Sequence, residues 1–161
     1  MAISSVLQNT FKEELLKGYH SFLASGGSAF KLALYSSGSA NLTTTTTQWV
    51  VASTPTADPT NTYEVTTTGS GYASGGKALT NTGVAKSTVT SYTDFSDVSW
   101  TSASFTARGC LLYNSSTISG LTTDAAVCSI DFGGDKTVSS GTFTIQFPTN
   151  DSSSAIIRIT S

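Results

Sequence analysis

The chain has 161 residues and a net charge of −2 at pH 7, and only 11% of its residues are charged. That fraction is well below the roughly 25% that is usual for soluble domains. The lysines and arginines form no basic cluster, which argues against binding of nucleic acid through its phosphates. A chain of this length is typical of one domain, so we expect residues 1–161 to fold as a single unit.

Serine and threonine together make up about a third of the chain. Because threonine favours strands and serine favours turns, this composition indicates β-structure. Residues 1–5 lack the basic start of a signal peptide, and no apolar run approaches the ~18–20 residues that a spanning helix needs. We therefore expect no contact with a membrane.

One helix is predicted near the start of the chain, over residues 5–17. Ser5 and Gln8 fit a capping box, in which both side chains bond free N–H groups of the first turn. Gly18 follows as a plausible end. The apolar residues recur at every fourth position and would form one stripe along the helix: Leu7, Phe11 and Leu15.

The rest of the chain is predicted to form about eight short strands, because apolar and polar residues alternate or apolar runs have strand length. These stretches include residues 30–35, 63–65, 102–113, 126–132, 141–147 and 155–159. Residues 42–51 are expected to be a loop that feeds a short strand or edge segment, and residues 71–79 a glycine-rich turn between strands. Gly133 and Gly134, followed by Asp135, are predicted to form a tight turn. The pattern indicates a mainly β protein, an antiparallel β-sandwich or jelly-roll-like fold with strands over 30–159 and one N-terminal helix.

The densest β-pattern lies in residues 94–114. Gly109 in this stretch predicts a bulge or a close backbone approach, the usual reasons for glycine in a strand. Cys110 and Cys128 have no histidine or cysteine neighbour at metal-binding spacing, and we expect buried free thiols rather than a cross-strand disulfide. Five large residues are expected in the core: Trp100, Phe105, Ile130, Phe143 and Ile145.

Two sets of residues could suggest catalysis. His20 is the sole histidine, but it lies among aromatic residues and no nucleophile motif accompanies it, so a structural role is expected. Asp94 and Asp97 near Trp100 would suit glycoside chemistry or a calcium site. Residues three apart on a strand point to opposite faces, however, so this pair is not expected to converge.

Two further stretches could suggest ligand binding. Asp131 and Asp135 flank a pair of glycines, but they lack the further oxygen ligands that calcium needs, and turn capping is the favoured role. The three glycines within residues 71–79 suggest a phosphate cradle only weakly, because no GK[ST] motif follows. The sequence therefore predicts no catalytic residue, no cofactor and no metal site.

Several blocks of the sequence carry a resemblance to known proteins. They are LQNTFKEELLKG (7–18), FKLALY (30–35), GYASGGKALTNTGV (71–84), DFSDVSW (94–100), FTARGCLLYN (105–114), CSIDFGGDKTVSSGTFTIQFP (128–148) and AIIRI (155–159). Together they resemble a family of small structural proteins encoded by tailed bacteriophages. The resemblance covers nearly the whole chain and implies a virion component without enzymatic activity, made in the cytoplasm of the host bacterium.

Within such a virion, the compact length and the lack of repeats or coiled-coil segments favour a capsid decoration or cement protein on the head shell. A tail or neck component, or a receptor-binding or glycan-binding module, is the alternative. The expected partners are the major capsid protein or other virion proteins, and a homo-oligomer or symmetric array is also expected.

Two segments are predicted at subunit contacts. One is the helix, through the stripe Leu7, Phe11 and Leu15, although the helix could instead simply plug one end of the sandwich. The other is the loop with Pro55 and Pro59, because prolines lower the entropy cost of ordering a contact segment.

Overall fold

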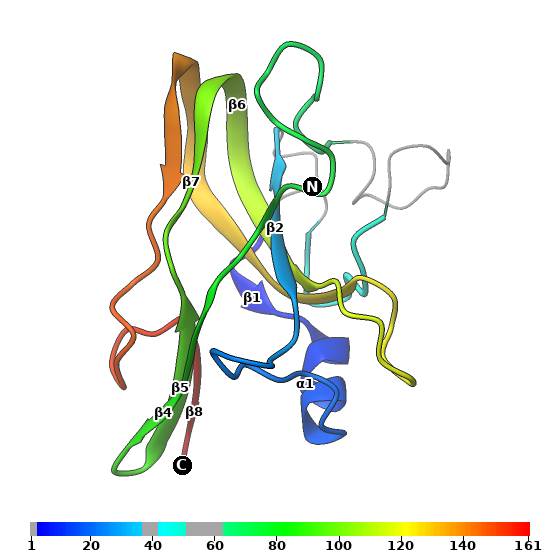
Figure 1. Ribbon diagram of the computed structural model, residues 1–161, viewed down its shortest axis with the longest axis vertical. Coiled ribbons are helices and arrows are strands. Elements are labelled where there is room, and N and C mark those ends of the chain that lie inside the picture. The colour runs from blue at the N-terminus through cyan, green and yellow to red at the C-terminus, as the bar shows by residue number, and fades with distance from the viewer. Residues whose placement is uncertain (1–2, 37–41, 51–62) are drawn as a thin grey trace.

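The computed structural model describes residues 3–36, 42–50 and 63–161 (Figure 1). This part of the chain is mainly β, with two antiparallel sheets and one short N-terminal helix, as the sequence predicts. The elements are β1 (Val6–Leu7), α1 (Asn9–Leu16), β2 (Phe30–Tyr35), β3 (Lys77–Ala78), β4 (Asn81–Ser87), β5 (Thr90–Phe95), β6 (Val98–Asn114), β7 (Ala125–Ile145) and β8 (Ile157–Thr160).

The larger sheet has the strand order β1-β7-β6-β2-β3, and the smaller has the order β4-β5-β8. The smaller sheet and α1 lie together at the lower end of the molecule in Figure 1. Within the described residues, no helix is long and apolar enough to cross a membrane.

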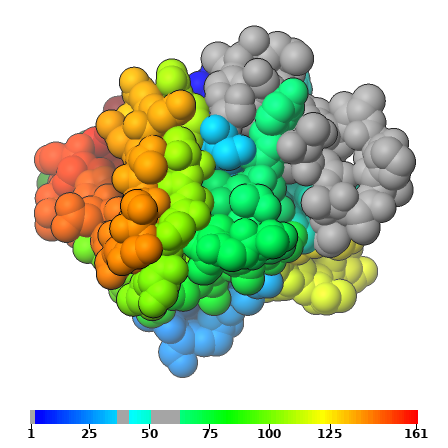
Figure 2. Space-filling view, turned by 90° about the horizontal axis from the view of Figure 1, so that it is seen from above, coloured from blue at the N-terminus to red at the C-terminus, as the bar shows by residue number. Residues whose placement is uncertain are grey.

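The two long strands β6 and β7 bend over together and so build both layers of the sandwich. The pairing between them is interrupted around residues 100–105 of β6. There, Ser102 of β6 and Ser140 of β7 have φ angles of +51° and +47°. Positive φ is uncommon outside glycine and marks a local change of chain direction. Figure 1 shows the bend at the top of the molecule, and Figure 2 shows the two strands side by side there. Strands that switch layers in this way form the corners of a sandwich.

The bend divides β7 into a first limb, residues 125–138, and a second limb, residues 141–145. The prediction of a tight turn at Gly133 and Gly134 is wrong, because both residues lie inside the first limb. β7 stays paired with β6 on both sides of them, and residues 132–135 lie opposite Arg108 alone. The glycines therefore form a bulge rather than a chain reversal.

The prediction of a bulge or close approach at Gly109 is confirmed. The pairing of β6 with β7 shifts between Ala107 and Gly109, and a Cβ at Gly109 would lie 2.5 Å from the carbonyl oxygen of Ile130. That distance is too short for any side chain, so β6 can pass this close to β7 only with glycine.

The helix begins at Asn9 rather than Ser5, and the predicted capping box is wrong. The residues before it form β1, which pairs with β7. The Ser5 hydroxyl accepts a hydrogen bond from the N–H of Asp131, and the Gln8 amide donates to the hydroxyl of Ser129 at 3.1 Å. Both side chains thus tie the start of the chain to β7 instead of capping α1.

The larger core cluster lies on the concave side of β6 and β7. Trp100, Phe105 and Phe143 are buried there as predicted, and the rings of Phe105 and Phe143 are 5.1 Å apart. Ile130 and Ile145 pack against this core but remain partly exposed. Their exposure follows from their place at the rim between the two limbs of β7.

Two smaller predictions can be compared with the structure. Cys110 and Cys128 are both buried and free, as predicted. In the stretch 42–50, the threonines form a turn, and Gln48 makes an isolated bridge with Ala125 before the buried Trp49. This agrees with a loop that feeds a short edge segment.

Candidate interaction surfaces

His20 is buried, and both of its ring nitrogens are hydrogen-bonded. Nε2 lies 3.2 Å from Glu14 Oε2, and Nδ1 lies 3.0 Å from the amide nitrogen of Asn114. The Asn114 oxygen accepts from the N–H of Ser116, so its NH₂ group faces the ring. Nδ1 is therefore the acceptor, and Nε2 carries the proton that is donated to Glu14. Burial lowers the pKa of His20, which keeps the ring neutral as a link between α1 and β6.

Asp94 and Asp97 anchor different backbone segments. Asp94 is buried and accepts hydrogen bonds from the N–H groups of Phe95 and Ile156, at 2.8 and 3.1 Å. Asp97 is exposed and accepts from the N–H of Phe147 at 2.9 Å. Burial raises the pKa of Asp94. One buried and one exposed carboxylate, each bonded to backbone, do not form a shared site, as their spacing of three residues predicts.

The glycine-rich stretch holds a carboxylate of the protein itself. Glu64 Oε1 accepts hydrogen bonds from the N–H of Gly75, at 2.6 Å, and from the hydroxyl of Tyr72, at 2.8 Å. Ser74 lies 3.3 Å from the other oxygen. Burial raises the pKa of Glu64. No pattern in the sequence predicts this role, because Glu64 lies in a short strand-like stretch about ten residues before the turn that it binds.

Asp131 caps the bulge of β7, in agreement with the predicted capping role. Its Oδ1 accepts from the N–H of Gly133 at 2.9 Å and from Arg108 Nε at 3.1 Å. Asp135 lies 3.9 Å from the same guanidinium group. Among the described residues, no group of three or more histidine, cysteine, aspartate or glutamate side chains could hold a metal ion.

Large apolar side chains are exposed at one end of the molecule, which we call the apolar end. In the part of the chain that the structure describes they are Leu16, Leu23, Val84, Val89 and Ile159. They come from α1, the loop after it, β4, the β4–β5 turn and β8, which lie together at the bottom of Figure 1. Leu16 is 91% exposed, and each of the others is more than half exposed.

A groove of about 410 Å³ runs through the apolar end, between α1 with its following loop and the β4-β5-β8 sheet. Leu15 and Phe22 line it on one side, and Val84, Ile157 and Ile159 line it on the other. Exposed apolar patches of this kind mark contact surfaces in soluble proteins.

The residues predicted at contacts are separated by the fold. Leu15 lines the groove of the apolar end. Leu7 lies on β1 rather than on the helix, and Phe11 is only 1% exposed and belongs to the core. The predicted helical stripe is therefore not a surface feature, and α1 covers one end of the core instead. Pro55 and Pro59 lie outside the described residues.

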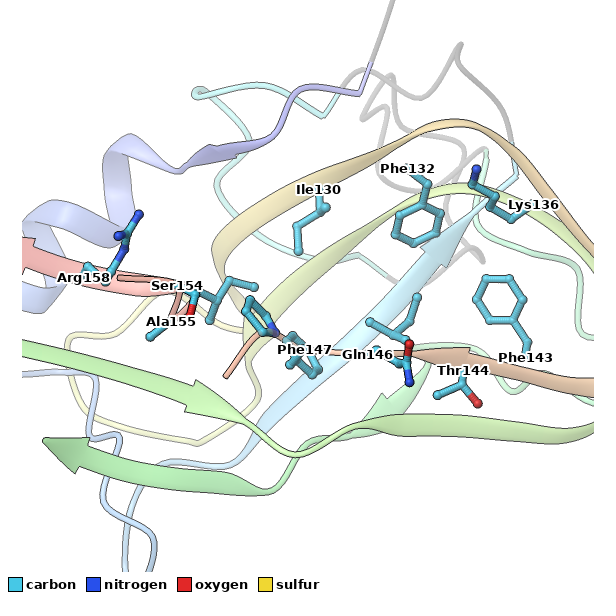
Figure 3. Close-up of a pocket in the computed structure, with 13 residues that line it drawn as sticks. Ile130, Phe132, Lys136, Phe143, Thr144, Gln146, Phe147, Ser154, Ala155 and Arg158 are labelled. Carbon is cyan, nitrogen blue, oxygen red and sulfur yellow. The ribbon is translucent and has the colours of Figure 1, made fainter. Parts of the chain in front are cut away.

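A second groove, of about 770 Å³, opens between the two limbs of β7 and is closed at one end by residues 154–158 (Figure 3). Its apolar side chains are partly buried and pack against the core: Ile130, Phe132, Ile145, Phe147 and Ile156. Lys136 and Arg158 also line this groove. We call it the β7 groove.

Comparison with known proteins gives no relative for this chain. No protein-family model, no curated protein and no solved structure matches it.

Proposed function

We propose that the chain is a non-enzymatic structural component of a tailed-phage virion, and specifically a capsid decoration or cement protein on the head shell. The observation that carries this proposal is the apolar end. Its five exposed side chains come from five separate segments at the same end of the molecule, and three of them, Leu23, Val84 and Ile159, line one groove. A surface of this kind is suited to contact with another protein rather than to chemistry on a small substrate.

The rest of the surface fits a protein that is packed closely with copies of itself. Only 11% of the residues are charged, and the net charge is −2, so neighbouring copies would repel one another weakly. The polar residues discussed above, His20, Glu64 and Asp94, hold backbone segments and side chains of the chain itself. The β-sandwich then serves as a rigid body that presents the apolar end to its partner.

Particles from the source that encodes the chain provide the test. Gold-labelled antibodies against the chain should decorate the head in electron micrographs, and the protein should be present at a copy number comparable to that of the major capsid protein. Label confined to the tail or neck would support the alternative, a tail, neck or receptor-binding component. Absence of the protein from purified particles would overturn the proposal.

A further inference from the structure

The β7 groove lies beside an unpaired strand edge. β1 covers the outer edge of β7 only at Cys128 and Ser129. From residue 132 onward, no described strand pairs with the side of β7 that faces away from β6. Apart from the N–H of Gly133, which donates to Asp131 within the bulge, such an edge presents free N–H and C=O groups and can accept a further strand from another chain.

Apolar contacts with the floor of the groove would stabilise that pairing. Figure 3 shows the side chains from the two limbs of β7 projecting into the space between them. Ile130 and Phe132 come from the first limb, while Ile145 comes from the second limb and Phe147 from the residues that follow it. Each packs on the core and stays partly exposed. An added strand would present every second side chain to this floor and bury it from water.

The charges of the groove specify the occupant further. Lys136 and Arg158 line it, and no aspartate or glutamate does. Among the described residues, neither cation forms a salt bridge, although Arg158 donates a hydrogen bond to the carbonyl oxygen of Ser153. A carboxylate on the bound segment would complement these positive charges.

We propose that the β7 groove binds an extended segment of another protein, which adds a strand to β7 and presents apolar side chains at alternate positions and a carboxylate to Lys136. The proposed function enters only in the identity of the partner, which would be another virion protein. The contact chemistry itself depends on the groove alone.

Synthetic peptides of about eight residues can test this chemistry. The probes alternate threonine and valine and carry glutamate, glutamine or lysine at one central position. Binding to the purified protein is measured by fluorescence anisotropy. The glutamate peptide should bind about tenfold more tightly than the lysine peptide, and Lys136→Glu should reverse that order. Lys86→Glu, which changes an exposed lysine on β4 outside the groove, should leave the order unchanged.

Hydrogen exchange separates strand addition from simple charge attraction. The bound glutamate peptide should slow exchange of amides in residues 132–145 and leave β4 unaffected. The proposal is overturned if no peptide binds at millimolar concentration, if Lys136→Glu leaves the preference unchanged, or if only an acidic oligosaccharide binds. These results do not depend on where the protein lies in a particle, so they are distinct from the outcome of the antibody labelling.

Discussion

His20 joins α1 to β6 through two hydrogen bonds, and the ring can serve both only in one protonation state. Nδ1 must stay unprotonated to accept from Asn114, while Nε2–H donates to Glu14. The ring also lies 4.9 Å from Phe11, so the surroundings are apolar apart from these two partners. A second proton would leave the Asn114 NH₂ group facing a donor and would place a charge in this environment.

The free energy of unfolding should therefore depend on pH through His20. Burial lowers its pKa in the folded state below the value of about 6.5 expected in the unfolded chain. Between these two pKa values only the unfolded state binds the extra proton. The contribution of His20 to the free energy of unfolding is therefore complete above about pH 6.5, and it declines as the pH falls toward the folded-state pKa.

His20→Gln should remove this dependence, whatever its effect on absolute stability. Urea denaturation of the native protein and the variant between about pH 5 and pH 8 would give the free energy of unfolding at each pH. The two proteins should differ in the slope of this free energy against pH. Glu64 contributes with the opposite sign, because its raised pKa makes stability fall as the pH rises. That contribution is present in both proteins and cancels in the comparison. Equal slopes would contradict the role assigned to His20.

The elements of the fold show which local signals decide structure. The run of residues 30–35, which is apolar except for Lys31, was sufficient to predict β2, whose observed bounds are Phe30–Tyr35. The Ser5 and Gln8 signal failed because β1 found partners on β7 that lie more than a hundred residues away. The glycine pair in β7 was ambiguous, since a turn and a bulge both favour glycine.

The residues of the two surfaces could be predicted from the sequence only in part, because segments distant in the sequence come together to form each surface. Leu15 was identified from its spacing, and it does line the groove of the apolar end. Val84 and Ile159 gave no such signal, because each is an isolated apolar residue whose neighbours are known only after the sheets form. Single exposed apolar residues are common in soluble proteins, and only their clustering carries information.

The crossing of the glycine-rich stretch over β2 can be tested with a matched pair of substitutions. Gly76 has a φ of +72°, and a Cβ there would lie 1.8 Å from the carbonyl oxygen of Leu32. Gly133 has the same φ, but no atom lies within 4 Å of its Cβ position. Gly133→Ala should cost about 1–2 kcal/mol for the backbone conformation alone. Gly76→Ala should cost roughly 4 kcal/mol or more, or prevent folding.

Urea denaturation of the two variants measures the difference directly. Similar losses of stability would show that the backbone of the glycine-rich stretch does not pack on β2 as closely as described. The pair isolates the steric overlap, because the conformational cost of a residue with positive φ is common to both substitutions.

The molecule as a whole presents two surfaces of different character. The apolar end has side chains that stand more than half exposed, whereas the apolar residues of the β7 groove are already partly buried. The first therefore suits a broad contact with a neighbouring protein surface, and the second suits a narrow extended segment. The two bent strands β6 and β7 link these regions into one sandwich.

The apolar end should control association without controlling folding. Leu16 and Ile159 are 91% and 59% exposed, so replacing both with glutamate should change the free energy of unfolding by only about 0.5 kcal/mol per site. At a contact surface, the same changes remove apolar burial of about 1–3 kcal/mol each and should weaken binding at least tenfold. The matched control is Thr101→Glu, an exposed position on β6 that lies in neither surface.

Sedimentation velocity of the purified proteins and occupancy on particles that lack the native copy would both report the effect. The double variant Leu16→Glu with Ile159→Glu should keep its melting curve and lose particle binding or self-association, while Thr101→Glu retains both. A double variant that folds normally, associates as the native chain does and fills particles completely would show that the contact lies elsewhere. Leu16 and Ile159 contribute little to the core. If the double variant loses association, this loss therefore cannot be attributed to loss of the fold.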